Sequence, residues 1–386
     1  MNMIATLLVS NILHFFAPDT AQHQLIVGSY TKKGNPGIEV YAVNAVTGKP
    51  KLLYTKENAN ASYLTLANNG KSMYAVTEGG KDASFVSAYQ LDATNQFQKL
   101  NQEPIKGAAP CFIVSRPESK TVYTANYTSG SVSVFKTLDN GALLPIAQEI
   151  NYSGSSIHKA RQEASHAHNV VLTPDHNQLL VTDLGADKIY MHKIYADGLL
   201  DEKYTTVSIT PGNGPRHFAF NNSGTHGYLI NELSGTVDVF SFRANALEKI
   251  QTITADTAKT TATKGSGDIH ISPSGKWLIT TNRVTSEQLT VFKIEADGKL
   301  TKMYHQPVAQ RPRNFSFSPN GNFVFVASQT EDKVQIFSFD DITGKLTNTN
   351  QDMAVSGPVC LVFSNDAMEV NPEERIKQLN IQLIPV

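Results

Sequence analysis

The amino-acid sequence predicts an all-β fold, a seven-bladed β-propeller of four-stranded antiparallel blades. Three observations support this prediction. A pattern of four strands recurs along the 386 residues, the copies are spaced like propeller blades, and the two ends of the chain carry complementary parts of one further copy. The length suits one large domain, because closed all-β folds often exceed the usual domain size.

Each repeat begins with an apolar strand, passes through a turn rich in Asn, Gly or Pro into a second strand, and ends with an alternating third strand and a fourth strand. The clearest copies begin at His168, Arg216, Asp268 and Arg313, and weaker copies begin at Ser62 and Cys111. These starts lie 49, 57, 48, 52 and 45 residues apart, near the roughly 40–50 residues of a propeller blade. The third strands alternate or are rich in β-branched and aromatic residues, which favours strands over helices.

The remaining repeat is divided between the ends of the chain. Residues 24–56 carry a second, third and fourth strand with no first strand before them, and GPVCLVFS at 357–364 is typical of a first strand with nothing after it. Pairing these two pieces removes the open edges that would invite aggregation. We therefore expect residues 360–363 to lie beside residues 25–30, within a propeller domain over 24–365 that is followed by a tail at 366–386.

Composition excludes several classes of protein. The chain has 33 basic and 34 acidic residues and a net charge of −1, so it lacks the overall positive field of a nucleic-acid-binding protein. Its two cysteines, Cys111 and Cys360, lie in the similar contexts AAPC and GPVC. These contexts indicate equivalent positions in two repeats rather than a disulfide, so stability must come from burial.

The N-terminal segment, residues 1–23, indicates either a signal peptide or a disordered or externally packed extension. Its apolar run over 4–16 is too short to span a bilayer and has the length of a signal-peptide core. A basic start and a clean cleavage site are missing, and Asn11 and His14 interrupt the run. Export to the periplasm is slightly favoured over a cytoplasmic location, and the rest of the sequence contains no membrane-span candidate.

Short motifs occur in a fixed order, about one in each blade. They are GSYT (28–31), SYL (62–64), ANYTSGSVSVF (125–135), HAH (166–168), GPRHF (214–218), NEL (231–233), TNR (281–283) and PRNF (312–315). Together they resemble the propeller-type lactonases, the family of the 6-phosphogluconolactonase propeller and the carboxymuconate lactonizing enzyme. This resemblance covers roughly residues 24–365. It implies an active site in one mouth of the central channel, formed by His168, Arg216, Glu232 and Arg283. Ser165 departs from the pattern, because relatives tend to have proline there.

The residues point to the same mouth without the resemblance. Only eight of the 33 basic residues are arginines, and three of these, Arg216, Arg283 and Arg313, occupy equivalent blade edges. Propeller repeats stack such positions around one end of the channel. Arginine offers a planar fork to carboxylate or phosphate, and a neutral histidine such as His168 can take a proton from water near pH 7. Lactone hydrolysis needs little else, so neither a covalent nucleophile nor a cofactor is expected.

These considerations lead to one hypothesis for the roles of the site residues. The catalytic residues are His168, Glu232 and Arg216, and the substrate-binding residues are Arg283, His166, His217 and Arg313. Arg283 is expected to hold the distal anion of the substrate. Four alternatives stay open. Arg216 and Glu232 could form a purely structural ion pair, and Arg283 and Arg313 could form salt bridges at the blade edges. His166 could be an ordinary hydrogen-bonding residue, and His168 could bind substrate without acting as a base.

Oxygen-bearing side chains also recur at the ends of second strands, and such sets can hold Ca²⁺. They are Glu78, Asn126, Asp183, Glu232 and Asn282. The same side chains can instead cap strands, and the neighbouring arginines would repel a cation. We therefore expect no metal.

The leading functional hypothesis is hydrolysis of 6-phospho-D-glucono-1,5-lactone to 6-phosphogluconate by an activated water, a step of the pentose phosphate pathway. If the protein is exported, an unphosphorylated aldonolactone fits better. The alternatives are a carboxymuconate-type cycloisomerase and a non-catalytic propeller that binds a protein or glycan. The expected partner is a small anionic sugar lactone, and the expected state is a monomer that neither binds nucleic acid nor spans a membrane.

Overall fold

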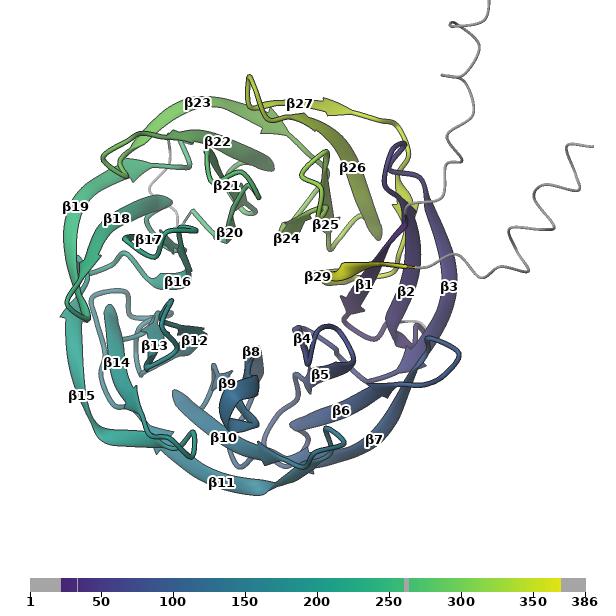
Figure 1. Cartoon of the computed structure of the whole chain (residues 1–386). Coiled ribbons are helices and arrows are strands. Elements are labelled where there is room, and N and C mark those ends of the chain that lie inside the picture. The colour runs from purple at the N-terminus through teal and green to yellow at the C-terminus, as the bar shows by residue number, and fades with distance from the viewer. Residues whose placement is uncertain (1–21, 33, 260–263, 369–386) are drawn as a thin grey trace, which may run out of the picture.

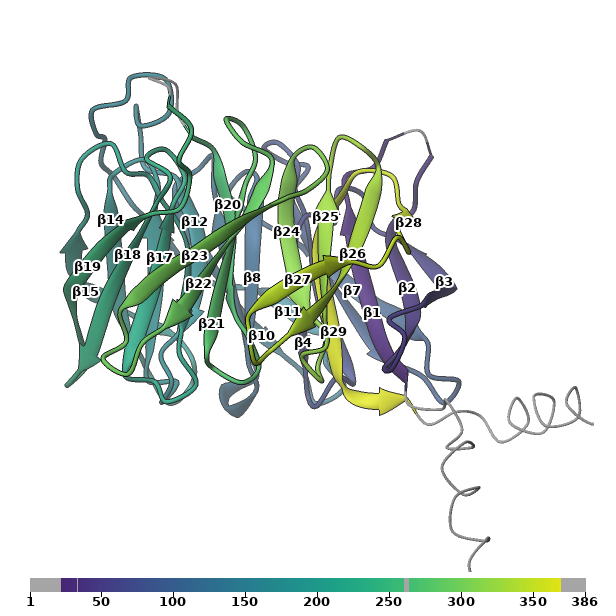
Figure 2. The same cartoon turned by 90° about the horizontal axis from the view of Figure 1, so that it is seen from above.

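The computed structural model describes residues 22–32, 34–259 and 264–368. Within these residues the chain forms seven antiparallel sheets that surround a central channel as the blades of a propeller (Figure 1). Seen from the edge, the ring is a disc whose strands run between its two faces (Figure 2). The predicted fold class is confirmed.

In each blade the first strand lies at the channel and the fourth at the rim (Figure 1). The blade shared by the two ends contains β29 (Pro358–Met368), β1 (Gln22–Ser29), β2 (Gly37–Asn44) and β3 (Pro50–Glu57). The next blade contains β4 (Leu64–Ala67), β5 (Ser72–Thr77), β6 (Phe85–Leu91) and β7 (Phe97–Pro104). The third contains β8 (Pro110–Arg116), β9 (Thr121–Asn126), β10 (Ser131–Thr137) and β11 (Leu143–Asn151), with a 3₁₀ turn at Pro117–Ser119.

The other four blades continue this order. They contain β12 (Ala167–Leu172), β13 (Gln178–Asp183), β14 (Lys188–Ile194) and β15 (Leu200–Ser208); then β16 (Pro215–Phe220), β17 (His226–Asn231), β18 (Thr236–Arg243) and β19 (Ala246–Thr254). The sixth contains β20 (Ser266–Ile271), β21 (Trp277–Asn282), β22 (Gln288–Ile294) and β23 (Leu300–Pro307). The last contains β24 (Pro312–Phe317), β25 (Phe323–Ser328), β26 (Lys333–Asp340) and β27 (Lys345–Asn348), and the short β28 (Met353–Ala354) also pairs with β26.

The blade that joins the chain ends closes as the sequence predicts. β29 pairs antiparallel with β1, and Leu25, Val27 and Gly28 face Phe363, Leu361 and Cys360 in register. The approach is close at Gly28, where a Cβ would lie 2.3 Å from the carbonyl oxygen of Ala61. The glycine therefore lets β1 pack against the next blade.

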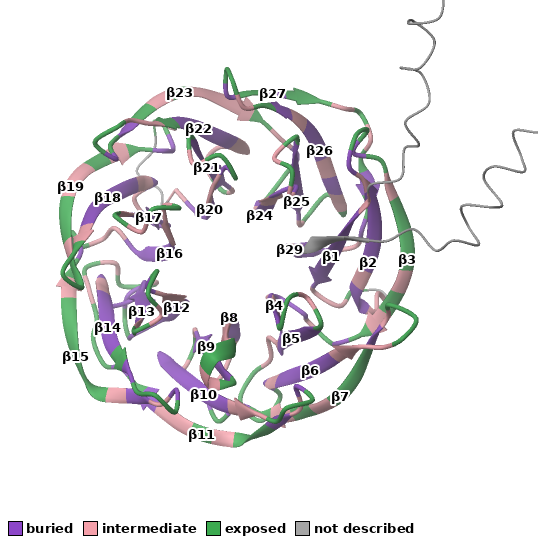
Figure 3. Ribbon diagram, in the orientation of Figure 1, coloured by how far each residue is buried: buried purple, intermediate pink, exposed green. Residues whose placement is uncertain are grey.

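The hydrophobic core lies between neighbouring blades. One cluster joins the terminal blade to the last blade and includes Leu25, Val27, Phe325, Ile336 and Leu361, all at most 4% exposed. The inner strands are largely buried, whereas the rim strands alternate between exposed and partly buried residues (Figure 3). Both cysteines are free and buried, so burial rather than a disulfide stabilises the ring.

Two sequence predictions concern the chain ends. Most of the predicted signal-like segment and most of the predicted C-terminal tail, residues 1–21 and 369–386, lie outside the described residues. Within the described residues we find no helix with the length and apolar character that a membrane crossing requires.

Candidate active site

Repeated β-bulges place the site residues at one mouth of the channel. In β12, Ala167 and Asn169 pair with consecutive residues of β13, so His168 has no cross-strand partner in the register. The same one-residue shift leaves Arg216 unpaired in β16 and Arg313 unpaired in β24. A bulge turns the extra side chain away from the regular pleat. The sequence predicted the positions of these residues but gave no sign of the bulges.

Glu232 is the centre of the site, and it lies directly after β17. Its backbone N–H donates to the carbonyl oxygen of Gly214 at 2.7 Å, which ties the end of β17 to the segment before β16. Gly214 has a φ of +66°, and a Cβ there would lie 2.5 Å from the side chain of Leu233. Glycine at 214 therefore lets Arg216 and Glu232 emerge side by side.

Three arginines converge on the Glu232 carboxylate. Nε of Arg216 and Nη2 of Arg283 each donate to Oε2 at 3.0 Å, and Nη2 of Arg161 donates to Oε1 at 2.6 Å. Although burial opposes ionisation, Arg283, Arg216 and Arg161 lower the pKa of Glu232 to about 2. The carboxylate is thus an anion held inside a cage of cations.

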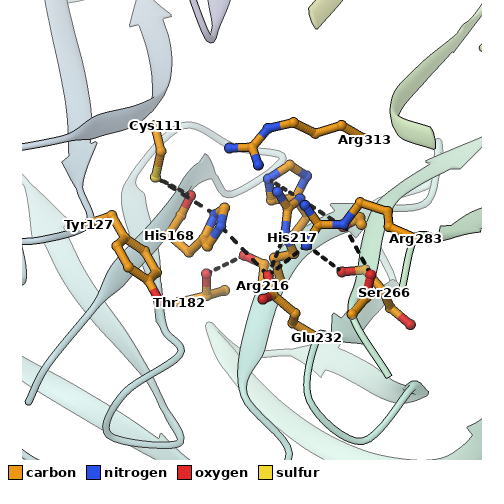
Figure 4. A network of polar contacts seen from close by, with 12 residues as sticks. Cys111, Tyr127, His168, Thr182, Arg216, His217, Glu232, Ser266, Arg283 and Arg313 are labelled. Carbon is orange, nitrogen blue, oxygen red and sulfur yellow. Dashed lines mark hydrogen bonds and ion pairs between the residues drawn. The ribbon is translucent and has the colours of Figure 1, made fainter. Parts of the chain in front are cut away.

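His168 lies beside this carboxylate, and its two ring nitrogens make only long contacts with described residues (Figure 4). Its Nε2 is 4.0 Å from Oε2 of Glu232, and its Nδ1 is 3.7 Å from Sγ of Cys111. The ring packs edge-on against Tyr127. Burial, reinforced by the charges of Arg216 and Arg313, lowers the pKa of His168 well below 6.5. The imidazole is therefore neutral near pH 7 and able to accept a proton.

His217 is fixed by partners on both ring nitrogens. Nη1 of Arg216 donates to Nε2 of His217 at 3.0 Å, so Nδ1 carries the hydrogen and donates to Oδ1 of Asp268 at 2.6 Å. The other carboxylate oxygen of Asp268 accepts from Nε2 of His270 at 2.8 Å. Burial and the charge of Arg216 lower the pKa of His217 to about 4. His217, one of the predicted substrate-binding residues, thus orients Arg216 in this structure.

Arg313 differs from the three arginines that bind Glu232, because its N–H groups are left without hydrogen-bond acceptors among the described residues. Its guanidinium group makes no hydrogen bond to a described residue; its contacts are Oε2 of Glu78 at 3.9 Å and the ring of Tyr30, whose centroid is 5.4 Å away. The hydroxyl of Tyr30 donates to the same Glu78 oxygen at 2.8 Å. The guanidinium group points toward His168 and His217 (Figure 4). Arg313 is therefore placed to bind an anion at the mouth.

His166, another predicted substrate-binding residue, is held by the protein. Its ring stacks on Tyr127 with centroids 4.5 Å apart, Nδ1 contacts the carbonyl oxygen of Tyr127 at 3.0 Å, and Nε2 lies 3.3 Å from Glu163. These contacts match the alternative of an ordinary hydrogen-bonding residue. A role in binding substrate stays a prediction.

Aromatic rings form the floor of the site. The rings of Tyr63 and Phe112 are tilted by 30° with centroids 3.8 Å apart, and the ring of Phe112 meets His217 edge-on at 5.1 Å. Beyond this floor a hollow of about 500 Å³ is lined by the later residues of first strands, including Leu66 and Phe317. This hollow is thus separate from the arginine cluster.

The oxygen-bearing ends of second strands mostly bond within the protein. Asp183 accepts from the backbone of His166 and from Gly185 and Ala186, while Asn126 donates to two serines. In the ranges 22–32, 34–259 and 264–368 we find no group of three or more His, Cys, Asp or Glu side chains placed to hold a metal ion. The side chains of Asp183 and Asn126 therefore act as strand caps.

A family model, related sequences and solved structures all match this chain over most of its length. A model of the family described as lactonase, 7-bladed β-propeller, matches residues 24–363. A 6-phosphogluconolactonase of Formosa agariphila is 33% identical over 343 residues, which cover 86% of this chain and 97% of that protein. The structure of the periplasmic gluconolactonase of Pseudomonas aeruginosa has a TM-score of 0.84 and 31% identity, covering 90% of this chain and 100% of that one.

The chain belongs to the propeller lactonase family. The four residues that the sequence resemblance implied for a lactonase site are gathered in the structure: Arg216 and Arg283 contact Glu232, and His168 lies 4.0 Å away from it. Sequence reasoning missed Arg161 in this lactonase, because that residue lies in the segment between β11 and β12, outside the repeat. Its rarity, as one of eight arginines, was the one signal that could have identified it.

Proposed function

We propose that the protein hydrolyses an anionic sugar lactone, 6-phospho-D-glucono-1,5-lactone, to 6-phosphogluconate, with water as the nucleophile. The observation that carries this proposal is the pairing of a neutral His168, whose ring nitrogens make only long contacts within the described chain, with the Glu232 carboxylate, beside the unused donors of Arg313. The names of related proteins, a 6-phosphogluconolactonase among them, support the substrate class.

The first chemical step is proton removal from water. His168 takes the proton on a ring nitrogen, and the resulting hydroxide attacks the lactone carbonyl carbon. Glu232 lies close enough to His168 to stabilise the imidazolium that forms. The negative charge that develops on the carbonyl oxygen is stabilised by the buried cation Arg216, which its hydrogen bonds to Glu232 and His217 hold in place.

The second step opens the ring. The tetrahedral intermediate collapses, the bond between the carbonyl carbon and the ring oxygen breaks, and His168 returns its proton to that oxygen, which becomes a hydroxyl group. No proton is gained or lost by the protein over the cycle. The product carries a new carboxylate, so each turnover near pH 7 releases one acid equivalent.

Arg313 and Arg283 bind the substrate in this proposal. Arg313 supplies the donors for the distal phosphate, because its guanidinium group has no hydrogen bond to a described residue. Arg283 already donates through Nε and Nη2 to Glu232 and to the carbonyl oxygens of Gly265 and Ser266. Its Nη1 remains for the substrate.

An unphosphorylated aldonolactone is the second candidate substrate, favoured by the similarity to the periplasmic gluconolactonase. Acid release measured by pH-stat compares 6-phosphoglucono-1,5-lactone, glucono-1,5-lactone and carboxymuconolactone. We expect the highest kcat/KM with the phosphorylated lactone. A higher value with the neutral lactone would exchange the two candidates, and no acid release from either sugar lactone would refute the proposed function.

A further inference from the structure

Arg161 differs from the other arginines at the mouth. Its side chain is 36% exposed, against 2% for Arg216, 11% for Arg283 and 19% for Arg313. Its side-chain partners are Oε1 of Glu232 at 2.6 Å and the hydroxyl of Tyr127 at 3.3 Å. It is thus the arginine at the site that a dissolved substrate can most easily reach.

The backbone beneath Arg161 is held in place. The next residue, Gln162, is fully buried, and its side-chain amide donates to the carbonyl oxygen of Leu184 at 2.9 Å and to Asp187 at 2.7 Å. The backbone N–H groups of Arg161 and Gln162 both bond to the carbonyl oxygen of His158. The guanidinium group can therefore change partners by side-chain rotation alone, without movement of the loop.

The two oxygens of Glu232 are held differently. Oε2 accepts from the buried Arg216 and Arg283, whereas Oε1 accepts from Arg161. Removal of Arg161 would expose Oε1 toward the mouth and leave the rest of the cage intact. An anion competes well for such a guanidinium group, because charge-assisted hydrogen bonds to phosphate or carboxylate are strong.

We propose that Arg161 blocks Oε1 of Glu232 until an anionic substrate displaces its guanidinium group. The substrate's phosphate, which Arg313 also binds in the proposed function, draws the guanidinium group away from Oε1, and the freed oxygen then accepts a hydrogen bond from the attacking water. A neutral lactone leaves the hydrogen bond between Arg161 and Oε1 of Glu232 in place. Arg161 thereby makes the site discriminate by charge in kcat as well as in KM. This inference rests on the proposed lactone hydrolysis and names a residue that sets its specificity.

The kinetic test compares Arg161→Ala and Arg161→Lys with Arg243→Ala, a control that removes an exposed arginine from β18. The measured quantity is the ratio of kcat/KM for 6-phosphoglucono-1,5-lactone to that for glucono-1,5-lactone. We expect Arg161→Ala to lower the ratio about 10- to 100-fold, the value of one charge-assisted hydrogen bond, and to raise kcat for the neutral lactone. Arg161→Lys should restore part of the ratio, and Arg243→Ala should keep it. An unchanged ratio, or an equal loss of kcat/KM with both substrates, would overturn the proposal that Arg161 blocks Glu232.

A pH profile supplies a readout that a structural role would not move. The charged and titratable groups that contact Glu232 are Arg161, Arg216, Arg283 and His168. Arg313, Tyr127 and Cys111 also interact electrostatically with the carboxylate. The loss of one cation raises the pKa of Glu232 and of the neighbouring His168, and the general base His168 works in its neutral form. The acid limb of neutral-lactone hydrolysis should therefore lie at higher pH in Arg161→Ala than in the wild type. Identical acid limbs in Arg161→Ala and the wild type would contradict the proposal that Arg161 blocks Glu232.

Calorimetric binding of the products separates this inference from the proposed function. We expect 6-phosphogluconate to bind the wild type more tightly than gluconate and Arg161→Ala to lose that preference. Arg161-dependent binding without hydrolysis of either lactone would refute the proposed function while supporting the contact between Arg161 and the anion. Wild-type affinity for 6-phosphogluconate in Arg161→Ala, or no binding of either acid by the wild type, would overturn the inference.

Discussion

Arg216 and Glu232 form a buried ion pair at the channel mouth, with Nε of Arg216 donating to Oε2 of Glu232 over 3.0 Å and side chains 2% and 6% exposed. The pair joins the first and second strands of one blade, as a purely structural pair would. However, the carboxylate also holds Arg283 and Arg161, which come from other segments of the chain. A pair that served only to join two strands would not need these extra cations, so the arrangement favours a functional site.

Glu232→Gln tests this carboxylate, because the variant leaves three arginines around a neutral amide. Loss of one partner from a buried ion pair costs about 3–5 kcal/mol, so we expect a fall of that order in the free energy of unfolding. We also expect kcat to fall by roughly 10² or more. Urea unfolding and lactone hydrolysis measure the two effects. Reduced stability with wild-type kcat would assign Glu232 a structural role alone.

The pH profile of the wild type tests the protonation state of His168. A general base works in its neutral form, which is populated above its pKa, and burial together with Arg216 lowers this pKa well below 6.5. Activity should therefore stay level as the pH falls through 6.5 and decline only at clearly lower pH. The measurement is kcat/KM for glucono-1,5-lactone over the pH range in which the protein stays folded. A decline centred near 6.5 would contradict the account.

Arg313→Ala separates substrate binding from chemistry. The unused donors of Arg313 predict that the variant raises KM for the phosphorylated lactone about tenfold or more, with kcat little changed. Arg283→Ala is the matched comparison, because Arg283 donates directly to Glu232, and we expect it to lower kcat as well as to raise KM. If Arg313→Ala lowered kcat alone, Arg313 would act in the transition state instead.

Gly28→Ala tests the close packing of β1, a strand of the terminal blade, against the next blade. The added Cβ would lie 2.3 Å from the carbonyl oxygen of Ala61, a backbone atom that cannot easily move. Overpacking of this kind costs about 1–3 kcal/mol, which thermal unfolding would detect. Gly80→Ala is the control, because its Cβ would have no atom within 4 Å. Equal stability of the two variants would show that the contact of β1 with the next blade is not tight.

The sequence allowed prediction of those features that repeat. Blade number and the pairing of β29 with β1 follow from equivalent positions around a closed ring. The set of His168, Arg216, Glu232 and Arg283 was implied by the resemblance to the propeller lactonases. Repetition of the first strand places its early residues at one mouth. No knowledge of individual contacts is needed for these predictions.

Contacts between different blades could not be predicted in this way. Arg161 comes from a segment outside the repeat, and its bond to Glu232 joins residues 71 positions apart. The bond from His217 to Asp268 likewise joins neighbouring blades, 51 positions apart. The sequence analysis assigned the distal anion to Arg283, and it gave no reason to rank Arg313 above Arg283 as the free cation. That difference depends on which donors the neighbouring blades use, and only the three-dimensional arrangement fixes it.

The most direct test of the central claim is the kcat of His168→Ala with 6-phosphoglucono-1,5-lactone, measured by pH-stat beside the wild type at pH 7. The fold should survive, because the packing of β12 rests on Val170 and Leu172, and a circular dichroism spectrum checks this. We expect kcat to fall roughly 10²–10⁴-fold, the usual contribution of a positioned acid–base group. A folded variant that keeps more than about a tenth of the wild-type kcat would contradict the assignment of His168 as the general base.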